Sequence, residues 1–428
     1  MARYDIAVIG GGAAGLMAAL AAAEEAGKQK QRLSVVVLEK NSRVGKKLLL
    51  TGNGRCNLTN KKLEMSRYHG DVPAAEGVIK FRPPQEVLRF FEDKGLLCRE
   101  EDQGRVYPQS GQASSVLDVL RLHLGRLGVE ERCDFSAVSL EKSGQDFIAH
   151  AASGETLKAR RVILTCGGKA APQTGSNGDG YALAKQLGHS VTALYPALVQ
   201  VKTDPERVRA LKGIRCPARV RLLADGKVLQ EECGEVQFAD GCLSGVCIFQ
   251  LSRQVSAWAQ GERRPGKRPP ALLEISLDLL EGRKEAEVLQ ALERRVSLFP
   301  SLPPLELLTG FVNKRLGQEL VKRQGLQTAK PGALRENQLQ GLVSLMNDFR
   351  FPALGVALWA NAQATAGGVP LREIDCATMD SRLCRGLYFA GEVLNVDGDC
   401  GGYNLQWAWS SGMLAGSSCA RSLEGEKC

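Results

Sequence analysis

The segment IAVIGGGAAGLMAALAAA, residues 6–23, determines the fold expected for the first part of the chain. A short, mostly apolar run at 4–9 ends in glycines, and residues 13–26 are rich in alanine and contain no proline. This pattern predicts a strand, a tight turn and a helix. The β-branched run LSVVVLEK, residues 33–40, supplies a second strand, so the opening is predicted to be a βαβ unit.

The glycines at the predicted turn have the spacing GxGxxG. Gly10 permits a sharp turn, Gly12 lets a diphosphate approach the backbone, and Gly15 allows the helix to pack closely on the sheet. The helix start offers N–H groups to phosphate oxygens. Glu39, at the end of the second strand, can accept both hydroxyls of an adenosine ribose and would repel a 2′-phosphate. The pattern predicts a dinucleotide site that suits NADP poorly and leaves FAD, NAD and S-adenosylmethionine open.

The remaining pattern predicts an α/β protein in which a Rossmann-like domain is interrupted by two insertions. Strands are predicted at 159–164 and 386–390, each before a Gly-rich turn, so one parallel sheet should collect strands from both ends of the chain. The predicted domains are a Rossmann-like domain (1–195 and 365–428), a β-rich domain (196–281 and 348–364) and a small helical domain (282–347).

Inside the insertions, local patterns predict individual elements. Strands are expected at 201–208, 219–229 and 272–280, with a turn at Asp225-Gly226 and a basic, Pro-rich connector at 263–270. Helices are expected over 284–299, 305–323 and 334–349.

Composition excludes several classes of protein. The 13 cysteines are dispersed without close pairs, and no segment has about 20 consecutive apolar residues, so we expect a soluble, cytoplasmic protein with reduced thiols. The four histidines, His69, His123, His150 and His189, have no ligand spacing, so no metal site is expected. The net charge of +9 comes from scattered Lys and Arg without a nucleic-acid motif, which makes a nucleic-acid partner an unfavoured prediction. The sequence carries no signature of a particular oligomeric state.

Two further segments contain groups that can bind a cofactor. In GKKLLLTGNGRCNLTN, residues 45–60, a glycine-rich loop around Asn53 can present amides and a guanidinium to a flat polar ring or to phosphates, although an ordinary polar surface loop would look the same. In GLYFAGEVLNVDGDCGGYNLQWAWSSG, residues 386–412, Glu392 can accept hydrogen bonds from ribityl hydroxyls. A helix starting at 402–404 can stabilise negative charge on a reduced flavin.

Taken together, these segments resemble a bacterial flavoprotein family, the NAD(P)/FAD-dependent oxidoreductases, over essentially the whole chain. The family includes aminoacetone-oxidase-like members and members associated with bile-acid reduction. The matching segments are IGGGAAGL (9–16), GKKLLLTGNGRCNLTN (45–60), TCGGKAAPQTGSNGDGYALAKQLGH (165–189), CLSGV (242–246), TAGGVPLREID (365–375) and AGEVLNVDGDCGGYNLQWAWSSG (390–412).

The resemblance implies a non-covalently bound FAD and a small-molecule substrate. The chain departs from the family pattern at Cys166, where a threonine is usual. The cysteine side chain has about the size of threonine, so cofactor binding should survive. It assigns no catalytic residue and no metal ligand. The cofactor-binding residues that it implies are Gly10, Gly12, Ala13, Ala14, Gly15, Glu39, Lys40, Lys47, Thr51, Gly52, Asn53, Gly54, Arg55, Cys56, Asn57, Val138, Cys166, Gly167, Gly168, Gly391, Glu392, Gly401, Gly402, Tyr403, Asn404 and Leu405.

Some side chains near the expected flavin allow two interpretations, a chemical role or a packing role. Cys56 and Cys400 have no neighbouring histidine in their loops and form no CxxC pair, which favours packing or flavin tuning over nucleophilic chemistry. Tyr403 can donate a proton to a substrate or simply pack. Trp407 and Trp409 face different ways on a helix, so at most one should touch the flavin.

The predicted function is hydride transfer between FAD and a small organic or steroid-like substrate. No second GxGxxG follows a strand, so NAD(P)H would bind only transiently as a reductant. Two alternatives stay open: an RNA-associated flavoprotein, prompted by the Arg-rich segments 207–221 and 263–268, and an NAD-dependent dehydrogenase that uses Gly10–Gly15.

Overall fold

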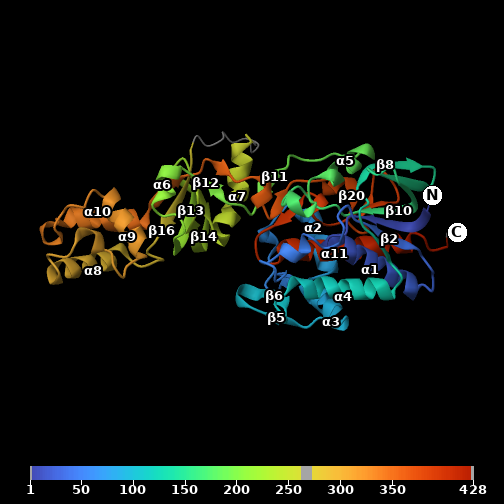
Figure 1. Cartoon of the computed structure of the whole chain (residues 1–428), viewed down its shortest axis with the longest axis horizontal. Coiled ribbons are helices and arrows are strands. Elements are labelled where there is room, and N and C mark those ends of the chain that lie inside the picture. The colour runs from blue at the N-terminus through green and yellow to red at the C-terminus, as the bar shows by residue number, and fades with distance from the viewer. Residues whose placement is uncertain (1, 262–271, 426–428) are drawn as a thin grey trace. The chain divides into compact units, whose positions relative to one another are not determined.

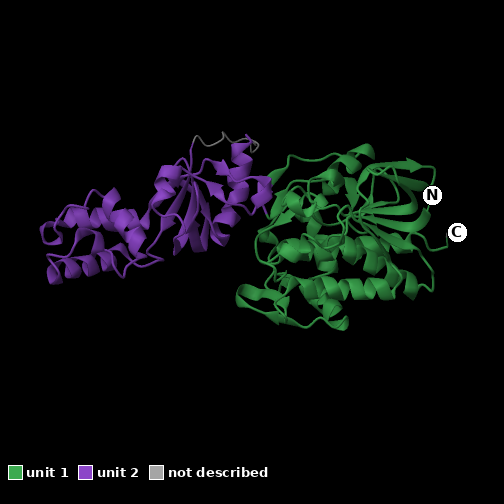
Figure 2. Cartoon of the chain, in the orientation of Figure 1, with its two compact units in different colours: residues 1–195, 363–428 green, residues 196–362 purple. Residues whose placement is uncertain are grey.

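The computed structural model describes residues 2–261 and 272–425, and the chain divides into two compact units. The first unit comprises residues 1–195 and 363–428, and the second comprises residues 196–362 (Figure 2). The predicted connector at 263–270 and the Arg-rich segment 263–268 lie outside the described residues.

A parallel sheet forms the centre of the first unit (Figure 1). Its parallel strands lie in the order β22 (Leu387–Phe389), β10 (Thr156–Leu164), β1 (Ala2–Ile9), β2 (Val35–Leu38) and β7 (Glu130–Arg132). Antiparallel strands extend it: β8 (Ala137–Ser143), β9 (Asp146–Ala151), β20 (Ile374–Asp375) and β21 (Asp380–Ser381). Strands from both ends of the chain join this sheet, which confirms the predicted Rossmann-like α/β class.

Two helices of the first unit pack unusually closely, α1 (Ala13–Lys28) and α11 (Tyr403–Arg421). A β-carbon on Gly412 would lie 2.7 Å from the carbonyl oxygen of Ala14, and one on Gly416 would lie 2.1 Å from that of Ala18. Glycine at both positions therefore lets the two backbones touch. The other helices of this unit are α2 (Val72–Phe81), α3 (Pro84–Asp93), α4 (Ala113–Arg126) and α5 (Asp179–Gln186).

Short strands complete the first unit. One small sheet joins β3 (Thr59–Asn60), β6 (Arg105–Pro108) and β5 (Cys98–Glu100), and another pairs β4 (Tyr68–Gly70) with β23 (Val396–Gly398). The chain passes between the units at β11 (Tyr195–Ala197) and again shortly before β19 (Ala364–Ala366).

The second unit contains an antiparallel sheet and helices. The strand order is β17 (Phe349–Pro352), β16 (Leu273–Asp278), β13 (Arg215–Ala224), β14 (Lys227–Phe238), β15 (Cys242–Ser244), β12 (Val201–Lys202) and β18 (Gly355–Val356). The helices are α6 (Pro205–Arg209), α7 (Val246–Ala259), α8 (Glu285–Leu298), α9 (Lys314–Arg323) and α10 (Glu336–Asn347). The predicted turn is present between β13 and β14, where Asp225 and Gly226 both have positive φ.

Two predicted elements of the second unit were wrong in extent. In the strand expected at 201–208, only Val201–Lys202 is extended, because Asp204 accepts a hydrogen bond from Glu206 N and Pro205 begins α6. The helix expected over 305–323 begins only at Lys314, where the side chain of Asn313 accepts a hydrogen bond from Arg315 N.

The helices and sheet of the second unit share one core. Leu292 of α8, Leu320 of α9 and Leu342 of α10 are fully buried in the same apolar cluster as Ile275 of β16. Across residues 2–261 and 272–425, no helix is both long and apolar enough to cross a bilayer.

Candidate functional site

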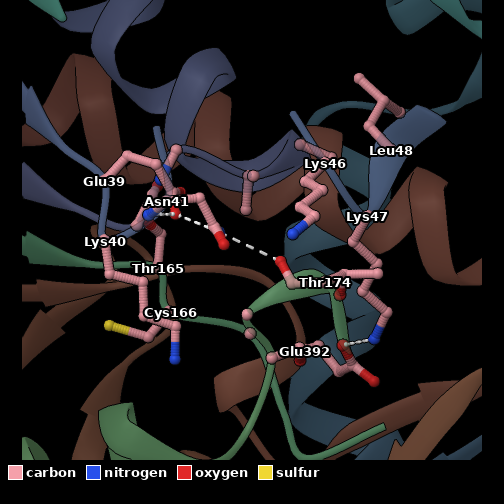
Figure 3. A pocket seen from close by; sticks show the side chains of 18 of the residues that line it. Glu39, Lys40, Asn41, Lys46, Lys47, Leu48, Thr165, Cys166, Thr174 and Glu392 are labelled. Carbon is pink, nitrogen blue, oxygen red and sulfur yellow. Dashed lines mark hydrogen bonds and ion pairs between the residues drawn. The ribbon is translucent and has the colours of Figure 1, made fainter. Parts of the chain in front are cut away.

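A cavity opens at the carboxyl ends of β1, β2 and β10 in the first unit (Figure 3). The space between its walls is about 1170 Å³, a value that includes space open to solvent. Ile9, Leu38 and Thr165, at or directly after the ends of these three strands, line it. In parallel sheets this edge is where ligands bind.

The glycine turn at the start of α1 forms one wall of the cavity. Gly10 has φ +112°, and a β-carbon on Gly15 would lie 1.9 Å from the carbonyl oxygen of Gly10, so both positions require glycine. The hydroxyl of Thr165 lies 2.8 Å from the same carbonyl oxygen and donates to it. Gly12 differs, because a β-carbon there would meet no atom within 4 Å. No side chain caps this helix start, so its N–H groups remain available to a ligand.

Glu39 is held rigidly at one end of the cavity. Its Oε2 accepts a hydrogen bond from Gly11 N at 2.9 Å, and its Oε1 accepts two from Asn41, from the backbone N at 2.9 Å and from Nδ2 at 2.6 Å. The side-chain amide of Asn41 also donates to the carbonyl oxygen of Thr174, at 3.1 Å (Figure 3). The carboxylate is thus oriented before any ligand arrives.

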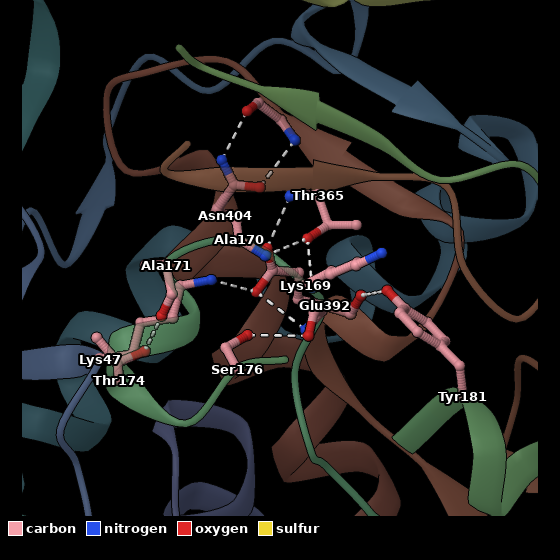
Figure 4. Close-up of polar contacts among 12 residues, drawn as sticks. Lys47, Lys169, Ala170, Ala171, Thr174, Ser176, Tyr181, Thr365, Glu392 and Asn404 are labelled. Atoms are coloured by element: carbon pink, nitrogen blue, oxygen red, sulfur yellow. Dashed lines mark hydrogen bonds and ion pairs between the residues drawn. The ribbon is translucent and has the colours of Figure 1, made fainter. Parts of the chain in front are cut away.

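Glu392 lies in the wall of the same cavity and is equally constrained (Figure 4). Its Oε1 accepts from Thr365 N at 2.8 Å, and its Oε2 accepts from Lys47 Nζ at 2.7 Å and from Gly168 N at 3.3 Å. The hydroxyl oxygen of Thr365 accepts from the backbone N–H groups of Lys169 and of the next residue, at 2.8 and 3.0 Å. This network fixes the segment after β10 against Glu392.

Three lysines line the cavity, and they differ in their partners. Lys47 pairs with Glu392, and Lys40 pairs with Asp179 at 2.6 Å. Lys46 has no ion-pair partner among the described residues. One positive charge in the wall is therefore left without a protein counter-charge.

The start of α11 forms a further wall. Asn404 and Leu405 line the cavity, and Gly402, with φ +99°, precedes the helix without a side-chain cap. Tyr403 instead points into the core, where its ring meets that of Tyr68 edge-on at 5.4 Å. A second helix start thus faces the cavity.

The sequence comparisons agree with this geometry. The family model for the HI0933-like protein Rossmann domain matches residues 4–418. The chain belongs to this HI0933-like family. Its relatives include a 3-dehydro-bile acid delta(4,6)-reductase of Clostridium scindens, 38% identical over 97% of this chain and 98% of that protein. A ribosomal RNA dihydrouridine synthase of Escherichia coli is 28% identical over 99% of this chain and 98% of that protein.

A solved structure shares the fold of this HI0933-like chain. The 3-ketosteroid delta1-dehydrogenase of Sterolibacterium denitrificans, solved with 1,4-androstadiene-3,17-dione, matches with a TM-score of 0.50 and 14% identity over 99% of this chain and all of that one. Membership of the family, together with the similarity to the bile-acid reductase, confirms the prediction of an FAD-dependent flavoprotein oxidoreductase.

The HI0933-like chain brings about half of the predicted site residues to the cavity. Those in its lining are Gly10, Gly12, Ala13, Ala14, Glu39, Lys40, Lys47, Thr51, Cys166, Gly167, Glu392, Asn404 and Leu405. Those outside the lining are Gly15, Gly52, Asn53, Gly54, Arg55, Cys56, Asn57, Val138, Gly168, Gly391, Gly401, Gly402 and Tyr403.

The residues outside the lining have several environments. Gly15 and Gly168 adjoin lining residues, and Val138 is 52% exposed beside Ala137, which does line the cavity. In the glycine-rich loop, Arg55 forms an ion pair with Glu101 and lies over a tyrosine ring instead of facing the cavity.

Asn57 ties the glycine-rich loop to the start of α11. In the orientation that satisfies its hydrogen bonds, its side-chain oxygen accepts from Gly402 N at 3.1 Å and its amide donates to Val106 O at 3.3 Å. In this structure the loop therefore supports the end of the cavity formed by α11.

Other residues of the cavity lining were not predicted from the sequence. Eight of them directly adjoin predicted residues, so widening each motif by one position would have found Ile9, Gly11, Leu38, Asn41, Lys46, Leu48, Ala137 and Thr165. The family segments 165–189 and 390–412 contain five more lining residues that were not singled out, Thr174, Gly175, Ser176, Asp179 and Ala408. No local pattern marked Phe135 or Gln363.

Two cysteines that were predicted as site residues are not poised for nucleophilic chemistry. Burial raises the pKa of the Cys56 thiol and of the Cys166 thiol to about 12 in each case. The thiol of Cys166 also donates to the carbonyl oxygen of Ile9, at 3.3 Å.

The indoles of Trp407 and Trp409 are buried, and each donates to a backbone carbonyl oxygen. Within the part of the chain that the structure describes, no cluster of His, Cys, Asp or Glu is arranged to hold a metal ion.

Proposed function

We propose that FAD lies along this cavity with its adenosine at Glu39 and its ribityl chain at Glu392. The diphosphate then lies over Gly12, where open space and the uncapped start of α1 offer room and N–H donors. The isoalloxazine ring lies toward the start of α11, whose N–H groups stabilise negative charge on the pyrimidine edge of the ring. The bound cofactor supplies hydride chemistry, and the protein supplies position and electrostatics.

The charges of the wall support this placement. Three carboxylates and three lysines line the cavity; Asp179 and Glu392 each have a lysine partner, and Glu39 accepts three N–H hydrogen bonds. Lys46 is the cation that remains, and a diphosphate supplies the complementary negative charge. Reduced cysteines and a cytoplasmic location belong to the same proposal.

The substrate that we propose is a conjugated ketone of a steroid-like molecule, with NAD(P)H as a transient reductant. Support comes from the bile-acid reductase that aligns with nearly the whole of both chains. The observation that carries the proposed function is that Glu39 and Glu392, 353 residues apart in sequence, line one cavity between two uncapped helix starts.

A second candidate is reduction of a uridine in RNA, because two relatives are named ribosomal RNA dihydrouridine synthases. The Arg-rich segment 207–221 speaks against it. Arg215 pairs with Glu235 at 3.2 Å, Arg219 with Glu231 at 3.4 Å, and Arg221 with Asp278 at 3.5 Å. These cations are already neutralised locally and would release few counterions on binding RNA.

Anaerobic stopped-flow spectroscopy separates the candidates. The purified protein should be yellow and release FAD on denaturation, which an NAD-dependent dehydrogenase would not. NADH or NADPH should bleach the flavin, and a 3-oxo-4,6-diene bile acid should restore its colour, whereas a uridine-containing RNA hairpin should not. Reoxidation by the RNA alone, with a salt-sensitive rate, would replace the steroid proposal with the RNA one.

A further inference from the structure

Reduction of a conjugated ketone needs a proton donor that the cavity lining does not supply in an evident form. Two electrons and one proton reach the β-carbon as hydride from the reduced cofactor, and a second proton must reach the α-carbon. Among the lining groups, Lys40 and Lys47 are paired with carboxylates, Lys46 is the cation that we assign to the diphosphate, and the thiol of Cys166 has a pKa of about 12. The donor is therefore expected on a neighbouring element.

An aspartate–histidine pair lies on segments that are hydrogen-bonded to the start of α11. His69, on β4, has its Nε2 2.9 Å from Asp399 Oδ1, and Arg67 Nη1 lies 3.3 Å from Asp399 Oδ2. The side chain of Asp399 is only 8% exposed, whereas that of His69 is 32% exposed. The carboxylate thus orients an imidazole that remains accessible, and His69 Nδ1 has no hydrogen-bond partner among residues 2–261 and 272–425.

Asn404 connects this pair to the cavity wall. Asn404 lines the cavity, and its side chain bonds both backbone groups of Gly398, accepting from N at 3.0 Å and donating to O at 2.6 Å. Asp399 follows Gly398 directly, and strand β23, which ends at Gly398, pairs with β4, which carries His69. The pair is therefore tied to the start of α11 through Gly398 and Asn404, and its own residues lie outside the cavity lining.

The other histidines do not combine these features. His189 is fully buried, with both ring nitrogens engaged by Glu373 and Ser381. His123, on α4, has its Nε2 3.2 Å from the carbonyl oxygen of Lys94. His150 pairs with Glu141 at 3.3 Å on β9, with a side-chain exposure of 37%, and its strand contributes no residue to the cavity lining.

We propose that His69, oriented by Asp399, is the proton donor to the α-carbon during reduction of a conjugated ketone. This inference rests on the proposed function. As hydride adds to the β-carbon, the C=C π bond breaks and the α-carbon takes the proton from Nδ1–H of the His69 imidazolium. The neutral imidazole then regains a proton from water. The electrons come from the flavin, which a nicotinamide reductant has reduced beforehand.

Single-turnover reoxidation of the reduced holoenzyme by a 3-oxo-4-ene steroid tests this role. His69→Gln should slow reoxidation at least 100-fold, in line with the typical contribution of general acid catalysis, and imidazole added to His69→Gly should restore part of the rate. Asp399→Asn should slow it about 10-fold by releasing the ring. His150→Gln, a histidine of similar exposure that also pairs with a carboxylate, should stay within twofold of the unmodified protein.

A second readout does not depend on turnover. Only four histidines are present, so carbon-13 labelling of the histidine rings gives few signals, and His69→Gln and His150→Gln assign the two that matter. Adding the steroid to the oxidised holoenzyme should shift the His69 signal and leave that of His150 in place. An unchanged His69 signal with bound steroid, or His69→Gln reoxidation within twofold of normal, would overturn this inference. Failure of the unmodified protein to react with any steroid would instead overturn the proposed function.

Discussion

Replacing Gly12 with alanine separates the role of this residue in the fold from its role in the cofactor site. Its φ of −84° suits any residue, and the added methyl group would meet no protein atom within 4 Å. The apoprotein should therefore lose less than about 1 kcal/mol of stability, the scale of a helix-cap effect. The methyl group instead enters the space that we assign to the diphosphate, and displacing a close contact of that kind should weaken FAD binding by at least about 1.4–2.8 kcal/mol, or 10- to 100-fold.

The assay is titration of the apoprotein with FAD, followed by quenching of flavin fluorescence, together with urea unfolding of the same samples. Gly27→Ala is the matched control, because it lies on the same helix and its methyl group would also meet nothing within 4 Å. The control should bind FAD normally and gain up to about 1 kcal/mol of stability from helix propensity. If Gly12→Ala binds FAD as tightly as Gly27→Ala does, the diphosphate does not lie over Gly12 and the reasoning fails.

Further predictions concern the rest of the site. Glu39→Gln should lower the free energy of unfolding in urea by about 1–3 kcal/mol and weaken FAD binding, because an amide cannot accept from all three N–H donors that surround the carboxylate. An unchanged free energy of unfolding together with an unchanged affinity for FAD would refute the role assigned to Glu39. Cys56 and Cys166 should resist iodoacetamide in the native protein at pH 8, because a pKa of about 12 leaves about one thiol in 10,000 ionised. Labelling should rise only as the pH approaches that pKa. Rapid labelling of either cysteine at pH 8, detected by peptide mass mapping, would contradict this prediction. Gly416→Val should cost more than about 1–3 kcal/mol, because its side chain would meet the backbone of Ala18; a melting temperature equal to that of the unsubstituted protein would show that the α1–α11 contact can relax.

The sequence predicted the elements whose signals are local. The Gly10–Gly15 turn, the strand before it and the helix after it were readable because positive φ and close packing restrict those positions to glycine. Glu39 was readable because it ends a β-branched strand at the expected distance. The common sheet formed by both ends of the chain followed from strands that end in Gly-rich turns.

The parts that sequence missed depend on contacts between distant segments. Asp179 enters the cavity wall through its ion pair with Lys40, 139 residues away, and no spacing rule marks such a pair. The helix predicted from residue 305 was too long because one capping side chain, that of Asn313, sets its start locally. The predicted three-part domain division stays a prediction, although the helices α8 to α10 bury leucines in the core shared with the second sheet.

A crystal structure of the protein with FAD tests the central claim most directly. We expect adenosine ribose hydroxyls within hydrogen-bond distance of Glu39, diphosphate oxygens over Gly12 near Lys46, and ribityl hydroxyls at Glu392. Electron density for the flavin in any other cavity, or with the adenine and isoalloxazine ends exchanged, would contradict it.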